Sequence, residues 1–176
     1  MSHADIVFAK HRKHMTAHRY HKVIAPFLAD TLNVRPETMA VIRNPVDRLR
    51  SWYRYRKRTD TDDAAHSTAD LSFDTFIMDV IADDPPPHAR VGNQFDFLCD
   101  GKGALLVDHL FAYERQVILR SFLCDRVGAQ LVFKQKNVSP DIPAPISAKV
   151  EDALRKARAP EFALHARALE AGHLSV

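Results

Sequence analysis

The amino-acid sequence predicts a single α/β domain spanning residues 1–176, with a short, largely parallel sheet flanked by helices. Short apolar runs that are typical of strands alternate along the chain with longer segments whose apolar residues recur at helical spacing. A length of 176 residues favours one domain. Hydrophobic residues make up 46% of the chain and charged residues 27%, so the chain has enough apolar material to bury a core.

The first third of the chain is expected to hold a helix, a strand and a second helix. Residues 10–29 have apolar side chains at helical spacing near their end. Residues 38–43 form an apolar run, which is the pattern of a strand covered on both faces. The next helix is expected over residues 45–58, because Asn44 is a favourable N-cap and Pro45 a favourable first residue.

The rest of the chain continues the same alternation of elements. The expected elements are, in order, a polar loop at 59–70, a helix at 73–81 capped by Ser72, a helix or turn at 91–98, a strand at 104–113, a helix at 114–127, a strand at 131–133, a loop at 136–145, and helices at 147–156 and 160–171. No internal repeat or low-complexity tract interrupts this pattern.

Charge and cysteine content narrow the classes of partner. The net charge of +3 is more compatible with a small anionic ligand than with a dedicated nucleic-acid protein. Cys99 and Cys124 match no metal or redox spacing, so we expect reduced thiols in a cytoplasmic protein. Apolar runs such as residues 104–107 are far shorter than a membrane span, and we expect no membrane partner. Association into a homo-oligomer is left open.

The most informative feature is the junction between the strand at 38–43 and the helix that follows. Arg43 lies where the strand ends, and ligands of open α/β sheets bind outside the carboxyl ends of the strands. Its guanidinium can grip two oxygens of one phosphate. Ser51 lies seven residues beyond Asn44, which is about two helical turns, so both face the same way. The alternative is that Arg43 pairs with a carboxylate and Ser51 faces solvent.

Residues 38–53 resemble the nucleotide-binding segment of sulfotransferases, in which a strand ends in arginine and a proline and a helical serine follow. The matching residues are Arg43, Pro45, Arg48, Ser51 and Tyr53. Three further segments resemble the family in the same order: Val91–Gln94 with Phe97 and Leu98, Val107–Phe111 with Tyr113 and Glu114, and Asn137–Pro140. The resemblance covers about residues 11–165 and is closest in style to bacterial members related to carbohydrate sulfotransferases.

The resemblance implies a P-loop-like three-layer fold and a sulfuryl transfer reaction. The co-substrate would be 3′-phosphoadenosine 5′-phosphosulfate, and the acceptor would be a hydroxyl group, with carbohydrate as the acceptor class. In the family pattern, Arg43 and Ser51 bind the 3′-phosphate of this nucleotide. Asn137 and Ser139 then lie at the edge of the nucleotide. No metal cofactor is implied.

One part of the family pattern has no counterpart in this sequence. The family begins with a strand, a glycine-bearing loop that cradles the 5′-phosphosulfate, and a helix, and a lysine of that loop stabilises the leaving group. The first 91 residues contain no glycine, although a phosphate-cradling loop needs one for close backbone approach. We therefore expect a domain that is N-terminally truncated relative to the family, with an open sheet edge or an exposed apolar face. Its activity is expected to be impaired or absent. The alternative is that the chain is a non-enzymatic module or a degenerate paralogue, which binds a nucleotide, another polyanion or an interaction partner.

Sulfuryl transfer also needs a base for the acceptor hydroxyl. His14 is the first candidate, because its context Lys13-His14-Met15 resembles a segment near the family's active site. The alternative for His14 is an ordinary surface histidine. Glu114 is the second candidate, and its alternative role is to cap the helix that follows its strand.

Two further patterns allow a functional and a structural interpretation. Four histidines recur at helical spacing: His11, His14, His18 and His21. They could ligate Zn²⁺, but no nearby carboxylate or metalloprotease motif supports a metal site, and none is expected. The basic and aromatic run at 48–58 is a candidate RNA surface. A helix with buried aromatic residues and solvated arginines is favoured instead, so nucleic acid is not an expected partner.

Overall fold

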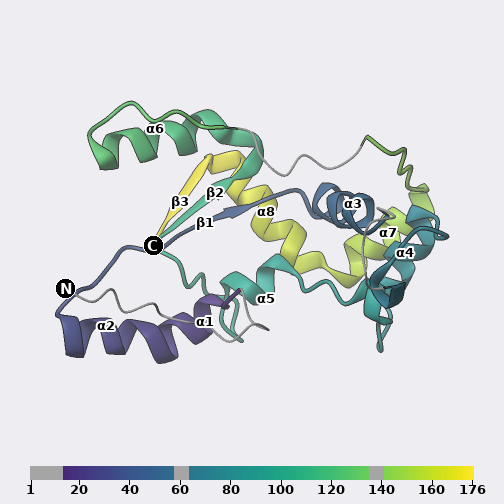
Figure 1. The fold of residues 1–176 in the computed structure, drawn as a ribbon, viewed down its shortest axis with the longest axis horizontal. Helices are drawn as coiled ribbons and strands as arrows, with labels where there is room; N and C mark the ends of the chain where they lie inside the picture. The colour runs from purple at the N-terminus through teal and green to yellow at the C-terminus, as the bar shows by residue number, and fades with distance from the viewer. Residues whose placement is uncertain (1–13, 58–63, 135–140) are drawn as a thin grey trace.

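A computed structural model of the chain describes residues 14–57, 64–134 and 141–176. At its centre lies a small sheet (Figure 1). Its strands are β1 (Met39–Ile42), β2 (His109–Ala112) and β3 (His173–Ser175), paired in the order β1-β2-β3. β1 runs parallel to β2, whereas β3 runs antiparallel to β2. The α/β class is confirmed, but the described sheet is mixed rather than largely parallel.

Helices of different length surround this sheet. The α-helices are α1 (Ala17–Arg19), α2 (Ala25–Leu32), α3 (Pro45–Arg56), α4 (Phe73–Val80), α5 (Gln94–Leu98), α6 (Gln116–Val127), α7 (Ala148–Ala157) and α8 (Ala159–Ala171). A π-helical stretch, Tyr20–Ile24, joins α1 to α2, and 3₁₀ turns lie at Ala64–His66, Pro87–Ala89 and Tyr113–Arg115. Among the described helices, we find none with the length and apolar character needed to cross a bilayer. Both cysteine thiols are free of disulfide bonds.

The sheet lies between helices, as the sequence predicts. On one face, Ile42 and Leu110 are fully buried in a cluster with Leu164 and Ala168 of α8. On the other face, Phe111 lies against Phe122 of α6, with 5.0 Å between the ring centroids. Figure 1 shows α6 and α8 on either side of the strands. Burial of apolar side chains from both helices therefore fixes β2 as the central strand.

β1 is buried on only one face. It forms an edge of the described sheet, and Met39 and Val41 are each 39% exposed. Val41 pairs in register with Phe111, so both side chains point to the face that carries α6. The prediction that residues 38–43 are covered on both faces is therefore wrong for this face.

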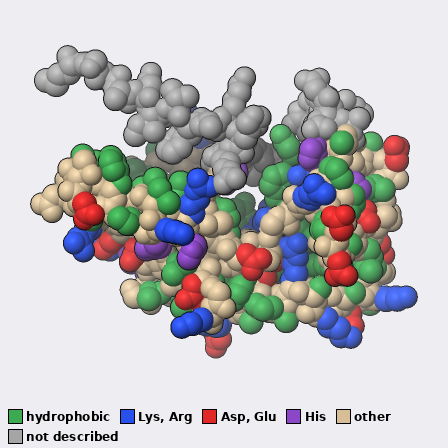
Figure 2. Space-filling model, turned by 90° about the horizontal axis from the view of Figure 1, so that it is seen from below, with side chains coloured by type: hydrophobic (Ala, Val, Ile, Leu, Met, Phe, Trp, Pro, Cys, Tyr) green, Lys and Arg blue, Asp and Glu red, His purple; other side chains and the backbone are tan. Residues whose placement is uncertain are grey.

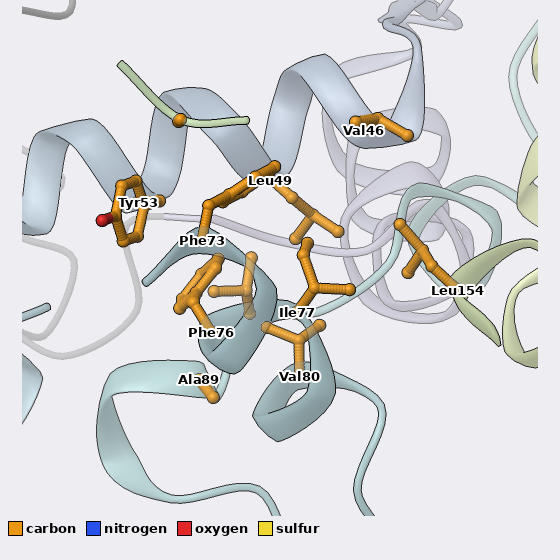
Figure 3. Packing of buried hydrophobic residues seen from close by; sticks show 11 residues of the cluster. Val46, Leu49, Tyr53, Phe73, Phe76, Ile77, Val80, Ala89 and Leu154 are labelled. Atoms are coloured by element: carbon orange, nitrogen blue, oxygen red, sulfur yellow. The ribbon is translucent and has the colours of Figure 1, made fainter. Parts of the chain in front are cut away.

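A second core cluster lies among helices, away from the sheet. The side chains of Leu49 on α3, Phe76 and Ile77 on α4, and Leu154 on α7 are fully buried there. Figure 3 shows them converging between the three helices. The ring of Tyr53 lies 5.7 Å from that of Phe76, a typical separation for an aromatic pair. This cluster holds α3 in place, and with it the junction that follows β1.

The amino-terminal helix begins later than expected and buries little. It starts at Ala17, where the Thr16 hydroxyl accepts a hydrogen bond from the Arg19 N–H, and residues 10–13 lie outside the described residues. The helix ends at Leu32, and its C-cap residue, Asn33, has a left-handed φ of 52°. Phe27 is exposed. The apolar spacing that predicts this helix therefore does not mark a core-facing stripe.

The expected strand at 131–133 is absent, and the third strand lies elsewhere. Residues 131–133 are irregular, and Val132 is 89% exposed. The strand is β3, which follows α8 after Gly172, a residue with φ of 74°. That left-handed conformation lets the chain fold back along β2. The expected strand at 104–113 is shortened to β2.

Asp108 joins the start of β1 to the start of β2. Its Oδ2 atom accepts hydrogen bonds from the N–H and the hydroxyl of Thr38, both at 2.6 Å. The Asp108 N–H donates in return to the Thr38 hydroxyl at 3.1 Å. The hydrogen bond from the Thr38 side chain, followed by that from its N–H, lowers the pKa of Asp108 below its usual value.

These bonds predict an acid-dependent contribution to stability. Because the folded-state pKa is lowered, the contribution is present above the ordinary aspartate pKa of about 3.9 and is lost as the pH falls through the folded-state pKa. Urea unfolding of Asp108→Asn should show a loss of stability at neutral pH that shrinks below about pH 3. Asp84→Asn, at a side chain 97% exposed, is the control. An Asp108→Asn deficit that is independent of pH would contradict this assignment.

Candidate anion-binding site

The junction between β1 and α3 has the local structure that the sequence predicts. Arg43 directly follows β1, and Asn44 is the N-cap of α3. The Asn44 Oδ1 atom accepts hydrogen bonds from the Val46 N–H at 3.0 Å and from the Asp47 N–H at 3.3 Å. Pro45 occupies the first helical position, where its missing N–H costs nothing. The capping residues in the sequence therefore predict correctly where α3 begins.

Two side chains from distant parts of the sequence hold the backbone of the turn. The Gln94 Oε1 atom accepts a hydrogen bond from the Arg43 N–H at 2.9 Å, and the Gln94 Nε2 atom donates to the Arg43 carbonyl at 2.8 Å. The Glu114 Oε1 atom accepts a hydrogen bond from the Asn44 N–H at 2.9 Å. Both peptide groups at the end of β1 are thus satisfied, and the position from which the Arg43 side chain projects is fixed.

The Arg43 side chain lies against an aromatic ring. Its guanidinium carbon is 4.9 Å from the centroid of the Tyr113 ring, a cation–π geometry. In the described ranges, no carboxylate lies within ion-pair distance of this guanidinium. Arg43 is half-buried. A positive charge thus remains at the carboxyl end of β1 without a bound counter-charge from the described part of the chain.

Of the other residues expected at the nucleotide, the structure describes only Ser51. Ser51 is half-buried on α3, two turns beyond Asn44 and on the opposite side of the helix from Leu49 and Tyr53. Neither Arg43 nor Ser51 lines either of the cavities beside Val41. Two further predicted residues, Asn137 and Ser139, lie outside the described residues.

Glu114 has a bracing role in the structure. Besides the Asn44 N–H, it contacts the buried His165, with 3.1 Å between Glu114 Oε2 and His165 Nε2. Burial raises the pKa of Glu114, but hydrogen bonds from the Asn44 N–H and from His165 outweigh it and lower the pKa. A carboxylate that is already hydrogen-bonded at both oxygens is a weak proton acceptor. The alternative of capping its own helix is wrong, because Arg115 is the N-cap of α6 and makes no side-chain capping bond. The role of Glu114 as a base stays a prediction.

His14 is exposed and lines a cavity of about 500 Å³ beside Arg48, Trp52 and Gln94. It precedes α1, so it does not share a helical face with the later histidines. Instead, the His21 Nε2 atom lies 2.6 Å from the Leu106 carbonyl oxygen. Within the described residues, no group of three potential metal ligands comes together. His11, the first member of the expected stripe, is outside those residues.

Sequence reasoning misses a buried carboxylate next to the turn. Glu161, in the first turn of α8, is 1% exposed. Its Oε1 atom accepts hydrogen bonds from the backbone and side-chain nitrogens of Gln94, both at 2.9 Å. Its Oε2 atom lies 3.3 Å from the Arg158 Nη1 atom, and Oε1 lies 4.0 Å from the Arg48 Nη1 atom. Glu161 thus positions Gln94, which in turn positions Arg43.

Much of the basic run on α3 is committed to the fold. Arg50 donates to the Ala144 carbonyl and pairs with Asp47, and Arg54 donates to the Ile142 carbonyl. On the face shown in Figure 2, lysine and arginine side chains are interspersed with acidic ones. Tyr53 is buried, but Trp52 and Tyr55 are exposed, so the interpretation of this run as a helix with buried aromatic residues and solvated arginines is wrong at these two aromatic positions.

Comparison of the chain with protein-family models, with curated proteins and with solved structures found no match.

Proposed function

We propose that this chain is a sulfotransferase-like domain that binds the 3′-phosphate of 3′-phosphoadenosine 5′-phosphosulfate at the β1–α3 turn. The observation that supports this proposal is the guanidinium of Arg43, which projects from a braced turn and lacks a carboxylate partner in the described part of the chain. The sequence resemblance supplies the identity of the ligand. A P-loop-like fold and transfer of the sulfuryl group to a carbohydrate hydroxyl are parts of the same proposal.

The turn favours recognition by a side chain rather than by the helix N-terminus. Asn44 already occupies the N–H groups of Val46 and Asp47, and Pro45 has no N–H to offer. A phosphate would therefore be held by the planar fork of Arg43, which can donate two parallel hydrogen bonds. The ring of Tyr113 under the guanidinium limits its orientations, so less conformational entropy is lost on binding.

The first prediction from this proposal concerns nucleotide binding. Adenosine 3′,5′-bisphosphate should raise the melting temperature of the protein, and Arg43→Ala should weaken its affinity by about 10- to 100-fold, the cost of losing a charge-assisted hydrogen bond pair. Arg155→Ala is a matched control, because Arg155 also lies over an aromatic ring, Phe162, but pairs with Glu151. If both variants weakened nucleotide affinity equally, the effect would come from net charge alone, and the assignment of Arg43 would be wrong.

Turnover is the second part of the proposal. In sulfuryl transfer, the acceptor hydroxyl oxygen forms a bond to sulfur, its proton passes to a base, and the bond from sulfur to the phosphate oxygen breaks. The departing phosphate needs positive charge close to it, and residues 1–91 supply no glycine for a cradling loop. We therefore expect this polypeptide to bind the nucleotide with little turnover when labelled donor is supplied with a panel of sugars. Robust turnover would contradict the expected impairment.

A second candidate function is that of a non-enzymatic interaction module, a degenerate paralogue. The observation that favours it is the apolar surface along the π-helical stretch, α2 and the segment after it, where Val23, Phe27, Leu32 and Val34 are exposed. A protein that shows neither turnover nor any stabilisation by adenosine 3′,5′-bisphosphate would support this second function.

A further inference from the structure

A cavity of about 500 Å³ lies beside the turn, between β1, α3 and α5. Its volume is in the range of pockets that hold small organic molecules. The residues that line it include Val41 of β1, Arg48 and Trp52 of α3, and Gln94 and Phe97 of α5. The wall thus combines apolar side chains with a few polar ones, the composition of a specific ligand site.

The positive charge of Arg48, which lines this wall, is poorly compensated. The Arg48 Nη1 atom is inaccessible to solvent and makes no hydrogen bond within the described residues. The nearest carboxylate, Glu161, lies 4.0 Å away and is already engaged by Gln94 and Arg158. Two guanidinium groups therefore share one carboxylate, which leaves a net positive charge at the cavity. A ligand with an anionic oxygen would offset this charge and accept a hydrogen bond from the part of the Arg48 guanidinium that lines the cavity.

Aromatic side chains supply the second feature of the cavity. Trp52 is 36% exposed and Phe97 is 38% exposed, and both line the cavity. Contact with a flat ring would remove apolar surface of both side chains from water. A bare inorganic anion cannot make this contact, and a neutral ring cannot satisfy Arg48.

We propose that this cavity binds a small aromatic carboxylate, with the carboxylate accepting a hydrogen bond from Arg48 and the ring packed against Trp52 and Phe97. This site goes beyond the proposed nucleotide function, since Arg43 does not line the cavity. Gln94 lies between the two sites, because it lines the cavity and its side-chain amide also bonds to the Arg43 backbone.

The single tryptophan of the chain makes the proposal directly testable. Trp52 is the only tryptophan in the sequence, so intrinsic fluorescence reports on the wall of this cavity. Benzoate should change the fluorescence in a saturable way. Benzamide, which keeps the ring but is neutral, and acetate, which keeps the carboxylate but lacks the ring, should each bind at least about tenfold more weakly. Benzamide that binds as well as benzoate, or benzoate without a saturable signal, would overturn the proposal.

Variants separate this cavity from other surfaces. Arg48→Gln and Phe97→Ala should each weaken benzoate binding by about tenfold or more. Phe97 is partly exposed, so its truncation keeps the test decisive if Arg48→Gln fails to fold. Arg43→Ala should leave benzoate affinity unchanged, as should Phe133→Ala, which removes a partly exposed aromatic ring from a different cavity. Unchanged affinity in Phe97→Ala, or a loss in Arg43→Ala equal to that in Phe97→Ala, would refute the site.

Discussion

Replacing Glu161 with alanine is expected to lower the free energy of unfolding by about 3–5 kcal/mol. Glu161 is almost completely buried, and its carboxylate is the counter-charge shared by Arg48 and Arg158. Its removal leaves two poorly solvated guanidinium groups without a carboxylate and takes away the one oxygen that accepts both hydrogen bonds from Gln94. Such a loss is a large part of the stability of a typical domain.

Urea unfolding at neutral pH would measure this effect. Glu161→Gln keeps the shape of the side chain and removes only its charge. It should therefore lower the free energy of unfolding by less than Glu161→Ala does. Glu170→Ala, at an exposed position on the same helix, is the matched control and should change stability by less than about 0.5 kcal/mol. Equal costs for Glu161→Ala and Glu170→Ala would show that Glu161 does not organise this cluster.

Truncation of the helical core at Phe76 should have an effect of similar size. Phe76 is fully buried between α3 and α4, beside the rings of Tyr53 and Phe73. Phe76→Ala removes these contacts and leaves a cavity, at a cost of about 3–5 kcal/mol. Figure 3 shows the ring within the cluster that holds α3 against its neighbours. The variant should therefore also loosen the anchoring of the β1–α3 turn.

Met78→Ala is the control for this truncation, because Met78 lies on the same helix and is 47% exposed. Its cost should be less than about 1 kcal/mol. Chemical denaturation monitored by circular dichroism would give both values. A cost for Phe76→Ala no greater than that for Met78→Ala would contradict the packing described for this cluster.

The parts of the fold that the sequence predicts well are those decided by neighbouring residues. Asn44 and Pro45 begin α3, and Ser72 caps α4 by accepting from the Thr75 N–H at 3.0 Å. In each case the side chain bonds to a backbone group two or three residues away, so the signal lies within one turn of the chain.

Strand assignments depend on partners that the sequence does not reveal. The apolar run at 131–133 has the composition of a strand but remains irregular, whereas His173–Ser175 pairs with β2. His173 stacks on Phe111 with 4.3 Å between ring centroids, and this tertiary contact outweighs local propensity. An apolar run alone therefore predicts a strand only when a sheet edge is available to it.

The buried cluster at Glu161 is also out of reach of sequence reasoning. A glutamate soon after Pro160 is typical of the first turn of a helix, where it interacts with the helix dipole. Arg158 lies three residues before it, but its other partners, Arg48 and Gln94, come from two other helices. The usable signal was the glutamine in the segment that resembles the sulfotransferase family, which marks position 94 without giving its partners.

The central claim is that Arg43 recognises the 3′-phosphate of a nucleotide, and a calorimetric comparison of two ligands tests it most directly. Adenosine 3′,5′-bisphosphate and adenosine 5′-monophosphate differ only in that phosphate, so the ratio of their affinities isolates its contribution. Wild-type protein should prefer the bisphosphate by about 10- to 100-fold, and Arg43→Ala should remove most of this preference. Equal affinities in the wild type, or a preference that survives in Arg43→Ala, would contradict this claim.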